Sequence, residues 1–448
     1  MTAARDTLRD TIAAIATPPG TGGVSIIRIS GSDALTIAQR LSGITPPPRR
    51  ATLAHIRDAH GDTLDQALLL YYPAPHSYTG EDILEIQGHG GIAVTQAVLA
   101  AALDAGSRLA EPGEYTRRAY LNDKIDLAQA EAIADLINAR SQAAVKAANR
   151  SLQGDFSREI DALAADLLAL RVYIEAALDF PEEEIDFLRE GDIAARLHAW
   201  GERLRTLLAQ STQGRLMNDG VNLVITGKPN AGKSSLLNAL VGEERAIVTA
   251  QAGTTRDIVR ETILIHGMPV NILDTAGLRE AEDLVEQEGI RRTRQALNQA
   301  DLILLLRDGS ALENIAEEEA LPADIPRLLA YNKADQTPPA VQAQHTDGLW
   351  LSAKTGAGID ALRDAIACAV GRDSREESPY IARERHLRAL QQAEDHYQHA
   401  LAQLHSTQNG ELIAEDLRLA HEALGSITGA VSSDDLLGHI FSSFCIGK

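Results

Sequence analysis

The sequence predicts an α/β and α protein in which an α/β domain is inserted into a helical domain. Residues 221–370 alternate short apolar runs with helical stretches, which is the pattern of a doubly wound, mostly parallel sheet. Helical sequence flanks this unit, over residues 126–213 and again after the charged segment 372–379. Two helical stretches around one α/β unit indicate a discontinuous helical domain, and a length of 448 residues fits about three domains.

The first 120 residues or so have the mixed pattern of an α+β domain. Val24–Ile29 is a short apolar run typical of a strand. Ile83–Gln87 alternates apolar and polar residues, which places Glu85 and Gln87 on one face of a second strand. An alanine-rich helical stretch follows this strand.

The helical stretch that follows carries apolar residues at three- and four-residue spacing, which form one stripe on a helix. They are Ile160, Leu163, Leu167, Leu170, Ile174 and Leu178. The domains expected from these patterns are an N-terminal domain over 1–122, a helical domain in two parts over 123–217 and 375–448, and an α/β domain over 218–374.

Composition narrows the class of protein. The chain has 42 basic and 63 acidic residues, a formal charge of −21, so contact with nucleic acid must use a local basic patch. Two cysteines cannot make a disulfide framework, and no apolar run is long enough for a membrane helix. We therefore expect a cytoplasmic protein.

A phosphate-binding loop follows the apolar run Val221–Ile225. Residues 227–234 read Gly-Lys-Pro-Asn-Ala-Gly-Lys-Ser, the G-x-x-x-x-G-K-[ST] pattern in its strand–loop–helix context. Backbone N–H groups of such a loop wrap a β-phosphate. Lys233 then neutralises the β- and γ-phosphate oxygens as a catalytic group, and Ser234 offers a hydroxyl to Mg²⁺.

Three further motifs occur in the order found in GTPases. Asp274–Gly277 follows an apolar strand and brings a carboxylate toward the Mg²⁺ shell. In Asn332–Asp335 the carboxylate of Asp335 can accept from the guanine N1–H and N2–H₂ groups, which adenine lacks. Ser352–Lys354 supplies backbone contact to the base. Together these motifs predict a guanine-nucleotide-hydrolysing P-loop GTPase, with a Ras-like nucleotide domain over 218–374.

The first switch loop of such a GTPase is expected at Gly253–Asp257, where Thr255 is the candidate second hydroxyl ligand of Mg²⁺. Leu278 stands where signalling GTPases carry a water-orienting glutamine, so that role must lie elsewhere. The predicted nucleotide contacts are Asn230, Ala231, Gly232, Lys233, Ser234, Ser235, Thr249, Ala250, Gln251, Ala252, Gly253, Thr254, Thr255, Asp274, Thr275, Ala276, Gly277, Asn332, Lys333, Asp335, Ser352, Ala353 and Lys354.

Over essentially its whole length the chain resembles the MnmE (TrmE) family of tRNA-modifying GTPases. Cys445–Lys448, at the end of the chain, matches the family's terminal Cys-Ile-Gly-Lys. The other matching runs are Ala16–Gly20, Ile29–Gly31, Tyr78–Asp82, His89–Gly91, Pro112–Thr116, Leu121–Lys124 and Asp126–Ala132.

The resemblance implies an N-terminal domain similar to folate-binding one-carbon domains, which also mediates homodimerisation. It implies addition of an aminomethyl or carboxymethylaminomethyl group at C5 of the wobble uridine in certain tRNAs, with the flavoprotein MnmG (GidA) as the partner that carries FAD. The one-carbon donor would be 5-formyl- or 5,10-methylene-tetrahydrofolate. G-domain dimerisation and K⁺ would stimulate GTP hydrolysis.

The resemblance also assigns site residues. Glu286 would orient the attacking water through a second water, and Cys445 matches a proposed reactive thiol, although a cysteine packed against Phe441 and Phe444 is an equal alternative. Thr21 departs from the arginine that many members carry. The residues implied in folate binding are Arg28, Glu85, Lys124 and Lys448, and those implied in K⁺ binding are Asn230, Thr249, Gln251 and Thr254.

Two other functions stay open from the residues alone: a ribosome-assembly GTPase switch and a GTP-regulated folate one-carbon enzyme. A single P-loop and the lack of a basic tail argue against the first. Arg117–Arg118 and Arg291–Arg294 are the notable basic clusters for tRNA contact, and each is usually a solvated face. No metal other than Mg²⁺ and K⁺ is expected.

Overall fold

The computed structural model divides the chain into two compact units, Met1–Ala134 with Gly425–Lys448, and Asp135–Leu424. The division expected from the sequence stays a prediction. The structure describes residues 10–139, 141–179, 193–228, 230–241, 260–274, 297, 300–312, 322, 325–370, 380–406, 410–430, 434–442, 444 and 447.

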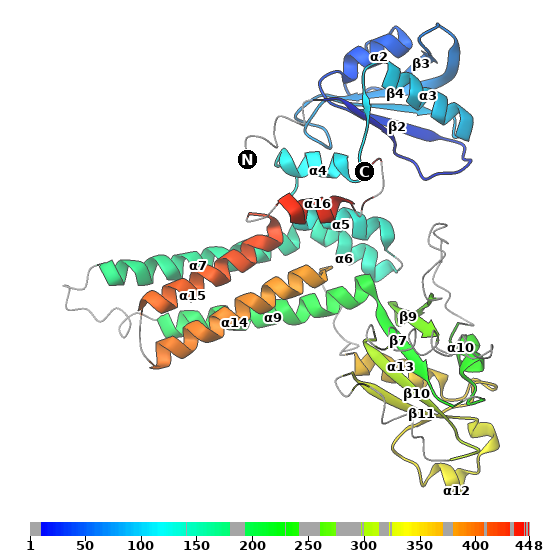
Figure 1. Cartoon of the computed structure of the whole chain (residues 1–448), viewed down its shortest axis with the longest axis vertical. Helices are drawn as coiled ribbons and strands as arrows, with labels where there is room; N and C mark the ends of the chain where they lie inside the picture. The colour runs from blue at the N-terminus through cyan, green and yellow to red at the C-terminus, as the bar shows by residue number, and fades with distance from the viewer. Residues whose placement is uncertain are drawn as a thin grey trace, which may run out of the picture. The chain divides into compact units, whose positions relative to one another are not determined.

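A six-stranded sheet forms the body of the first unit (Figure 1), in the order β3-β4-β5-β2-β1-β6. Neighbouring strands are antiparallel except β1 and β6. The strands predicted near residues 24–29 and 83–87 are confirmed as β2 and β5. The strand bounds are β1 Ile12–Ile15, β2 Ser25–Ser30, β3 Thr52–Arg57, β4 Thr63–Tyr72, β5 Ile83–Gly88 and β6 Arg108–Leu109.

The two faces of this sheet have different cores because side chains alternate along each strand. Ala13 of β1 joins the core on which α2 (Ala34–Ser42) and α3 (Ile92–Asp104) pack, whereas its neighbours Ile12 and Ala14 pack with Tyr115 of α4 (Glu114–Leu121). A separate small core joins α5 (Leu127–Asn138) to α16 (Asp434–Ser442) through Leu127, Ala130, Ile440, Phe441 and Phe444.

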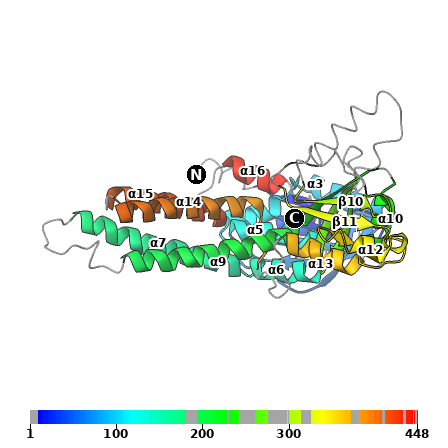
Figure 2. The same ribbon diagram turned by 90° about the horizontal axis from the view of Figure 1, so that it is seen from below.

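Long helices make up much of the second unit. The longest of them lie side by side in Figures 1 and 2. The predicted apolar stripe is confirmed on α7 (Asp155–Asp179), where its members from Ile160 to Ile174 are at most 2% exposed. The side chain of Leu178 lies outside the described residues. The helices are α6 Gln142–Leu152, α7 Asp155–Asp179, α9 Ile193–Asp219, α14 Glu384–Ser406 and α15 Gly410–Thr428.

The nucleotide domain has a six-stranded sheet in the order β12-β11-β10-β7-β9-β8. All pairs are parallel except β8 with β9, which confirms the mostly parallel sheet. The elements are β7 Val221–Thr226, α10 Lys233–Val241, β8 Arg260–Ile265, β9 Met268–Asp274, β10 Leu302–Asp308, β11 Arg327–Asn332, α12 Pro339–Gln342, β12 Leu349–Trp350 and α13 Ile359–Ala369. Among the described helices, none has the length and apolarity to cross a membrane.

Arg118 of α4 is a buried charge in the first unit, with 1% of its surface exposed. Its guanidinium donates to Asp10 at 2.7 Å, to Glu114 at 2.9 Å and to both carboxylate oxygens of Glu81 at 3.1 Å. The sequence placed Arg118 with Arg117 in a candidate tRNA-contacting cluster. That assignment is wrong for Arg118, because its guanidinium is buried and is held by three carboxylates of the same unit.

We expect Arg118→Met to destabilise the first unit by about 3–5 kcal/mol, because the change removes a buried cation that Glu81, Glu114 and Asp10 share. Arg117→Met is the matched control. The Arg117 side chain is 37% exposed, its carboxylate partner is 3.9 Å away, and its loss should change stability by less than about 0.5 kcal/mol. Hydrogen exchange of the β1 and α4 amides measures both effects, and equal protection in the two variants would contradict the role of Arg118.

The difference in hydrogen-exchange protection between the wild type and Arg118→Met should become smaller at low pH. Hydrogen bonds from Arg108 and then Arg118 outweigh burial and hold the pKa of Asp10 below 3.8. Burial raises the pKa of Glu114, but hydrogen bonds from Arg108, the Glu111 amide and Arg118 lower it further, to below 4.5. A lowered pKa gives stability that is present above the ordinary value and is lost as the pH falls through the folded value. The wild type should therefore lose protection below about pH 4, and the variant less.

Candidate functional site

The predicted nucleotide motifs meet at the carboxyl ends of the parallel strands, where ligands bind in open α/β sheets. The P-loop follows β7, Asn332 ends β11, and Ser352 follows β12. A cavity of about 560 Å³ opens there. Its lining residues are Gly232, Ser235, Asn238, Ala239, Asn332, Lys333, Asp335, Gln336, Ser352, Ala353 and Lys354.

Close backbone packing shapes the P-loop. A Cβ atom on Gly227 would lie 2.1 Å from the carbonyl oxygen of Leu306 in β10, so only glycine fits there. Asn230 has a φ of 64°, in the left-handed region. Lys233 begins α10, and its Nζ donates to the carbonyl oxygens of Gly227 at 2.6 Å and Lys228 at 3.0 Å. Its ammonium group therefore lies over the loop, where phosphate oxygens would bind.

The side chain of Asn332 joins the phosphate end of the cavity to its base end. Its Nδ2 donates to the carbonyl oxygen of Ala231 in the P-loop at 2.9 Å. Its Oδ1 accepts from the backbone N–H groups of Lys333 at 2.8 Å and Ala353 at 3.0 Å. Asn332 is 3% exposed. One buried amide thus fixes three segments that lie far apart in the sequence.

Asp335 lies at the base end as an exposed carboxylate. The hydroxyl of Ser352 donates to its Oδ1 at 2.7 Å, and this bond lowers the pKa of Asp335 below 3.8. Lys333 has a φ of 65°, and its Nζ lies 2.5 Å from the carboxylate of Asp308. The group that would accept from guanine is therefore ionised at neutral pH, as the chemistry of base selection requires.

Asp274 ends β9, where it pairs in register with Ile225 of β7. Its backbone position is beside the P-loop strand, and its side chain lies outside the described residues. The predicted residues Thr249–Thr255, Thr275–Gly277 and Glu286 also lie outside them.

The N-terminal unit brings two of the predicted folate residues together. Arg28 of β2 pairs in register with Glu85 of β5, and its guanidinium donates to the carboxylate at 2.9 and 3.0 Å. The rings of Tyr78 and Tyr115 lie 5.7 and 5.8 Å from this guanidinium. Lys124 donates from Nζ to the carbonyl oxygen of Pro75 at 3.0 Å. Cys445 and Lys448 lie outside the described residues.

The structure adds residues to the site that sequence reasoning missed. Asn238 and Ala239 line the cavity three and four residues after Ser235, a spacing that puts them on the same helix face. Gln336 lies next to the base-reading Asp335. Helical spacing from the P-loop serine is the signal that would have found the first two.

The fold and the site define a P-loop GTPase: a mostly parallel sheet carries, at one edge, the phosphate-binding loop motif and the carboxylate of Asp335 that the sequence predicts to select guanine. Two family models match, "MnmE helical domain" over residues 127–445 and "GTP-binding protein TrmE N-terminus" over residues 11–124. The chain belongs to the MnmE family.

Relatives named tRNA modification GTPase MnmE match over nearly the full length. The relative from Dichelobacter nodosus is 60% identical and the one from Stutzerimonas stutzeri 53%, each over 98% of this chain and 99% of the relative. Among solved structures, a variant of Aquifex aeolicus Era bound to GDP·AlF4⁻ is 28% identical, covering 39% of this chain and 65% of that one, with a TM-score of 0.27. The G domain of the T. maritima FeoB iron transporter is 24% identical, covering 33% and 98%, with a TM-score of 0.25.

We expect Asn332→Ala to weaken GDP binding by about 10- to 100-fold, because each buried group left unpaired costs about 1–3 kcal/mol. Asn238→Ala is the control, since Asn238 lines the same cavity but is exposed. It should change affinity less than about threefold, within the small effects of surface substitutions. Titration with a fluorescent GDP analogue measures both. Equal affinities in the two variants would show that the Asn332 bonds do not shape the site.

Proposed function

We propose that this chain hydrolyses GTP to GDP and phosphate as part of a cytoplasmic tRNA-modifying machine. With a flavoprotein partner of the MnmG type, it would add a carboxymethylaminomethyl or aminomethyl group at C5 of the wobble uridine in certain tRNAs. The observation that carries the nucleotide part is the ionised Asp335 carboxylate, set across one cavity from the P-loop. Relatives that are 53–60% identical and are named tRNA modification GTPases support the tRNA part.

The groups proposed for hydrolysis follow from the chemistry of phosphoryl transfer, in which positioning and charge stabilisation do most of the work. Lys233 would neutralise the β- and γ-phosphate oxygens. Ser234 and Thr255 would ligate Mg²⁺, and Asp274 would support its water shell. Glu286 would orient the attacking water, since Leu278 has no polar group to do so.

A K⁺ ion is proposed beside the phosphates, held by the side chain of Asn230 and by oxygens of Thr249, Gln251 and Thr254. A monovalent cation there would offset charge that develops between the β- and γ-phosphates. An arginine finger does this in other GTPases and is worth about 10³–10⁵ in rate.

A folate one-carbon carrier is proposed for the N-terminal unit. Arg28 and Glu85 fit it as a cation and an acceptor side by side, because folate carries carboxylates and its pterin presents N–H donors. The ring of Tyr78, which is partly exposed beside Arg28, offers apolar surface to a flat ring system, whereas Tyr115 is fully buried. Lys124 and Lys448 are proposed to add cations for the folate carboxylates, and Cys445 is the candidate thiol.

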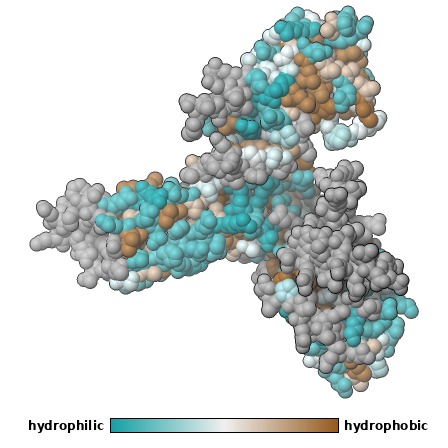
Figure 3. Space-filling view, in the orientation of Figure 1, coloured by the Kyte–Doolittle hydropathy of each residue, from teal (hydrophilic) through white to brown (hydrophobic). Residues whose placement is uncertain are grey.

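Homodimerisation is proposed through the N-terminal domain. Apolar residues gather on one part of this unit's surface in Figure 3, and patches of this kind mark interaction sites. The large apolar side chains exposed in the unit include Val24 at 61%, Leu53 at 59% and Ile92 at 62%. The proposed domain limits are 1–122, 123–217, 218–374 and 375–448.

Deletion of the gene should remove the aminomethyl-type wobble uridines from cellular tRNA. A plasmid with the wild-type gene should restore them, whereas Asp274→Ala should not, because it removes the carboxylate proposed to support Mg²⁺. Mass spectrometry of tRNA nucleosides measures this. An unchanged profile after deletion would favour the ribosome-assembly alternative, and the GTPase assignment would stand.

Hydrolysis of GTP should be faster in K⁺ than in Na⁺ at matched ionic strength, and Asn230→Gly should abolish the difference. Glycine is chosen because Asn230 has a φ of 64°, where alanine would add backbone strain and confuse the result. Asn230→Asp retains a side-chain oxygen and is the control that should keep part of the K⁺ effect. Equal wild-type rates in both salts would contradict the K⁺ site.

A further inference from the structure

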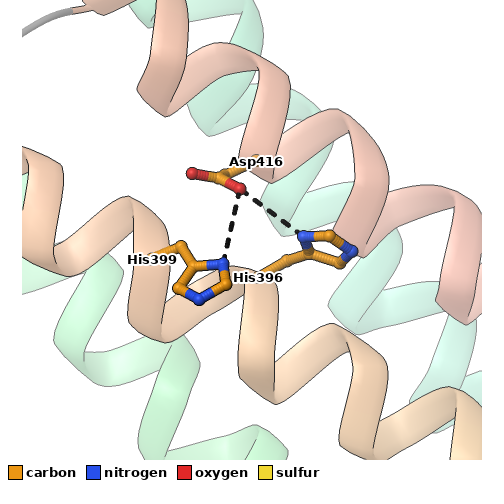
Figure 4. Close-up of side chains that lie close together, drawn as sticks. All are labelled: His396, His399 and Asp416. Atoms are coloured by element: carbon orange, nitrogen blue, oxygen red, sulfur yellow. Dashed lines mark ion pairs between the residues drawn. The ribbon is translucent and has the colours of Figure 1, made fainter.

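Three side chains with metal-ligating atoms meet on two neighbouring helices, far along the chain from the nucleotide motifs. His396 and His399 lie one turn apart on α14, and the three-residue spacing puts them on one helix face. Asp416 of α15 points between them (Figure 4). One ligand atom from each lies within 4.8 Å of the others.

The distances in this cluster are long for hydrogen bonds. Asp416 Oδ1 is 3.5 Å from Nδ1 of His396 and 4.0 Å from Nδ1 of His399, at or beyond the outer limit for such bonds. Ligands bound to one Zn²⁺ ion at about 2.0–2.2 Å, in tetrahedral directions, lie roughly 3.3–3.6 Å apart. Small side-chain movements would therefore bring all three atoms onto one ion.

The carboxylate of Asp416 has no arginine or lysine partner within the described ranges, although its side chain is only 19% exposed. The nearby Arg418 is engaged elsewhere, with Glu415 at 2.7 Å and with Glu422. Nδ1 of His396 is shielded from solvent and has no hydrogen-bond partner among the described residues. A half-buried anion without a cation, beside an unsatisfied imidazole, favours the binding of a cation that also accepts nitrogen ligands.

We propose that His396, His399 and Asp416 form a binding site for a divalent metal of the Zn²⁺ class that joins α14 to α15. Two imidazoles and one carboxylate suit Zn²⁺, whereas Mg²⁺ prefers oxygen ligands alone. Three protein ligands leave a fourth position for water or for a group from a partner. The site is thus independent of the Mg²⁺ and K⁺ proposed near GTP.

The metal would cross-link the two helices of the hairpin α14–α15. α14 ends at Ser406 and α15 begins at Gly410, so the two helices are joined by a short connection. An ion held by both helices would fix their register and slow their separation, because binding to the folded state stabilises that state.

The test is titration of the full chain, saturated with Mg²⁺ and GDP, with Zn²⁺ in a calorimeter. We expect one tight Zn²⁺ per chain that millimolar Mg²⁺ does not displace. Asp416→Asn and His399→Gln should each weaken it by tenfold or more, because each removes a proposed ligand and changes to groups that merely orient ligands already cost about 10–100-fold. His405→Gln, on the same helix but outside the cluster, is the matched control and should bind as the wild type does.

Hydrogen exchange of the α14 and α15 amides gives a second readout. Zn²⁺ should slow this exchange in the wild type and in His405→Gln, and should leave it unchanged in Asp416→Asn. Co²⁺ in place of Zn²⁺ should give a visible spectrum without the thiolate bands that binding at a cysteine would produce. Equal Zn²⁺ affinity in the wild type and Asp416→Asn, or exchange that Zn²⁺ does not change, would overturn the proposal.

Discussion

The three hydrogen bonds of the Asn332 side chain are the constraint on which the nucleotide site depends. A buried amide must satisfy both its N–H₂ and its carbonyl group, and each bond it misses is costly in the interior. The partners of Asn332 are Ala231 in the phosphate loop and the amides of Lys333 and Ala353 at the base end. The side chain of Asn332 therefore holds the phosphate-binding loop at a fixed distance from the segments at the base end of the cavity.

The neighbouring glycines follow from this arrangement. A Cβ atom on Gly232 would lie 2.2 Å from Nδ2 of Asn332, so the amide reaches the loop only because residue 232 has no side chain. A Cβ atom on Gly309 would lie 2.7 Å from the carbonyl oxygen of Asn332. Glycines therefore pack against the end of β11 on two sides, where any larger residue would collide with Asn332.

Sequence patterns predicted the elements whose signal is local. The apolar stripe on α7 and the strands before each motif follow from periodicity, and the motifs follow from their order. Patterns did not predict features that join distant segments. Arg118 is buried against Asp10, 108 positions away, and only the packing of α4 on β1 shows this. The spacing of His396 and His399 is visible in the sequence, but the position of Asp416 depends on how α15 is rotated against α14.

Charge explains why the site cations are placed as they are. In a chain of net charge −21, carboxylates are abundant, and a cationic side chain readily pairs with one of them. Arg28 is paired with Glu85 and Lys333 with Asp308, and the ammonium group of Lys233 donates to the carbonyl oxygens of Gly227 and Lys228 in the phosphate-binding loop. Lys233 and the backbone N–H groups of the loop are therefore the groups proposed to bind phosphate, and the acidic surface repels phosphate elsewhere.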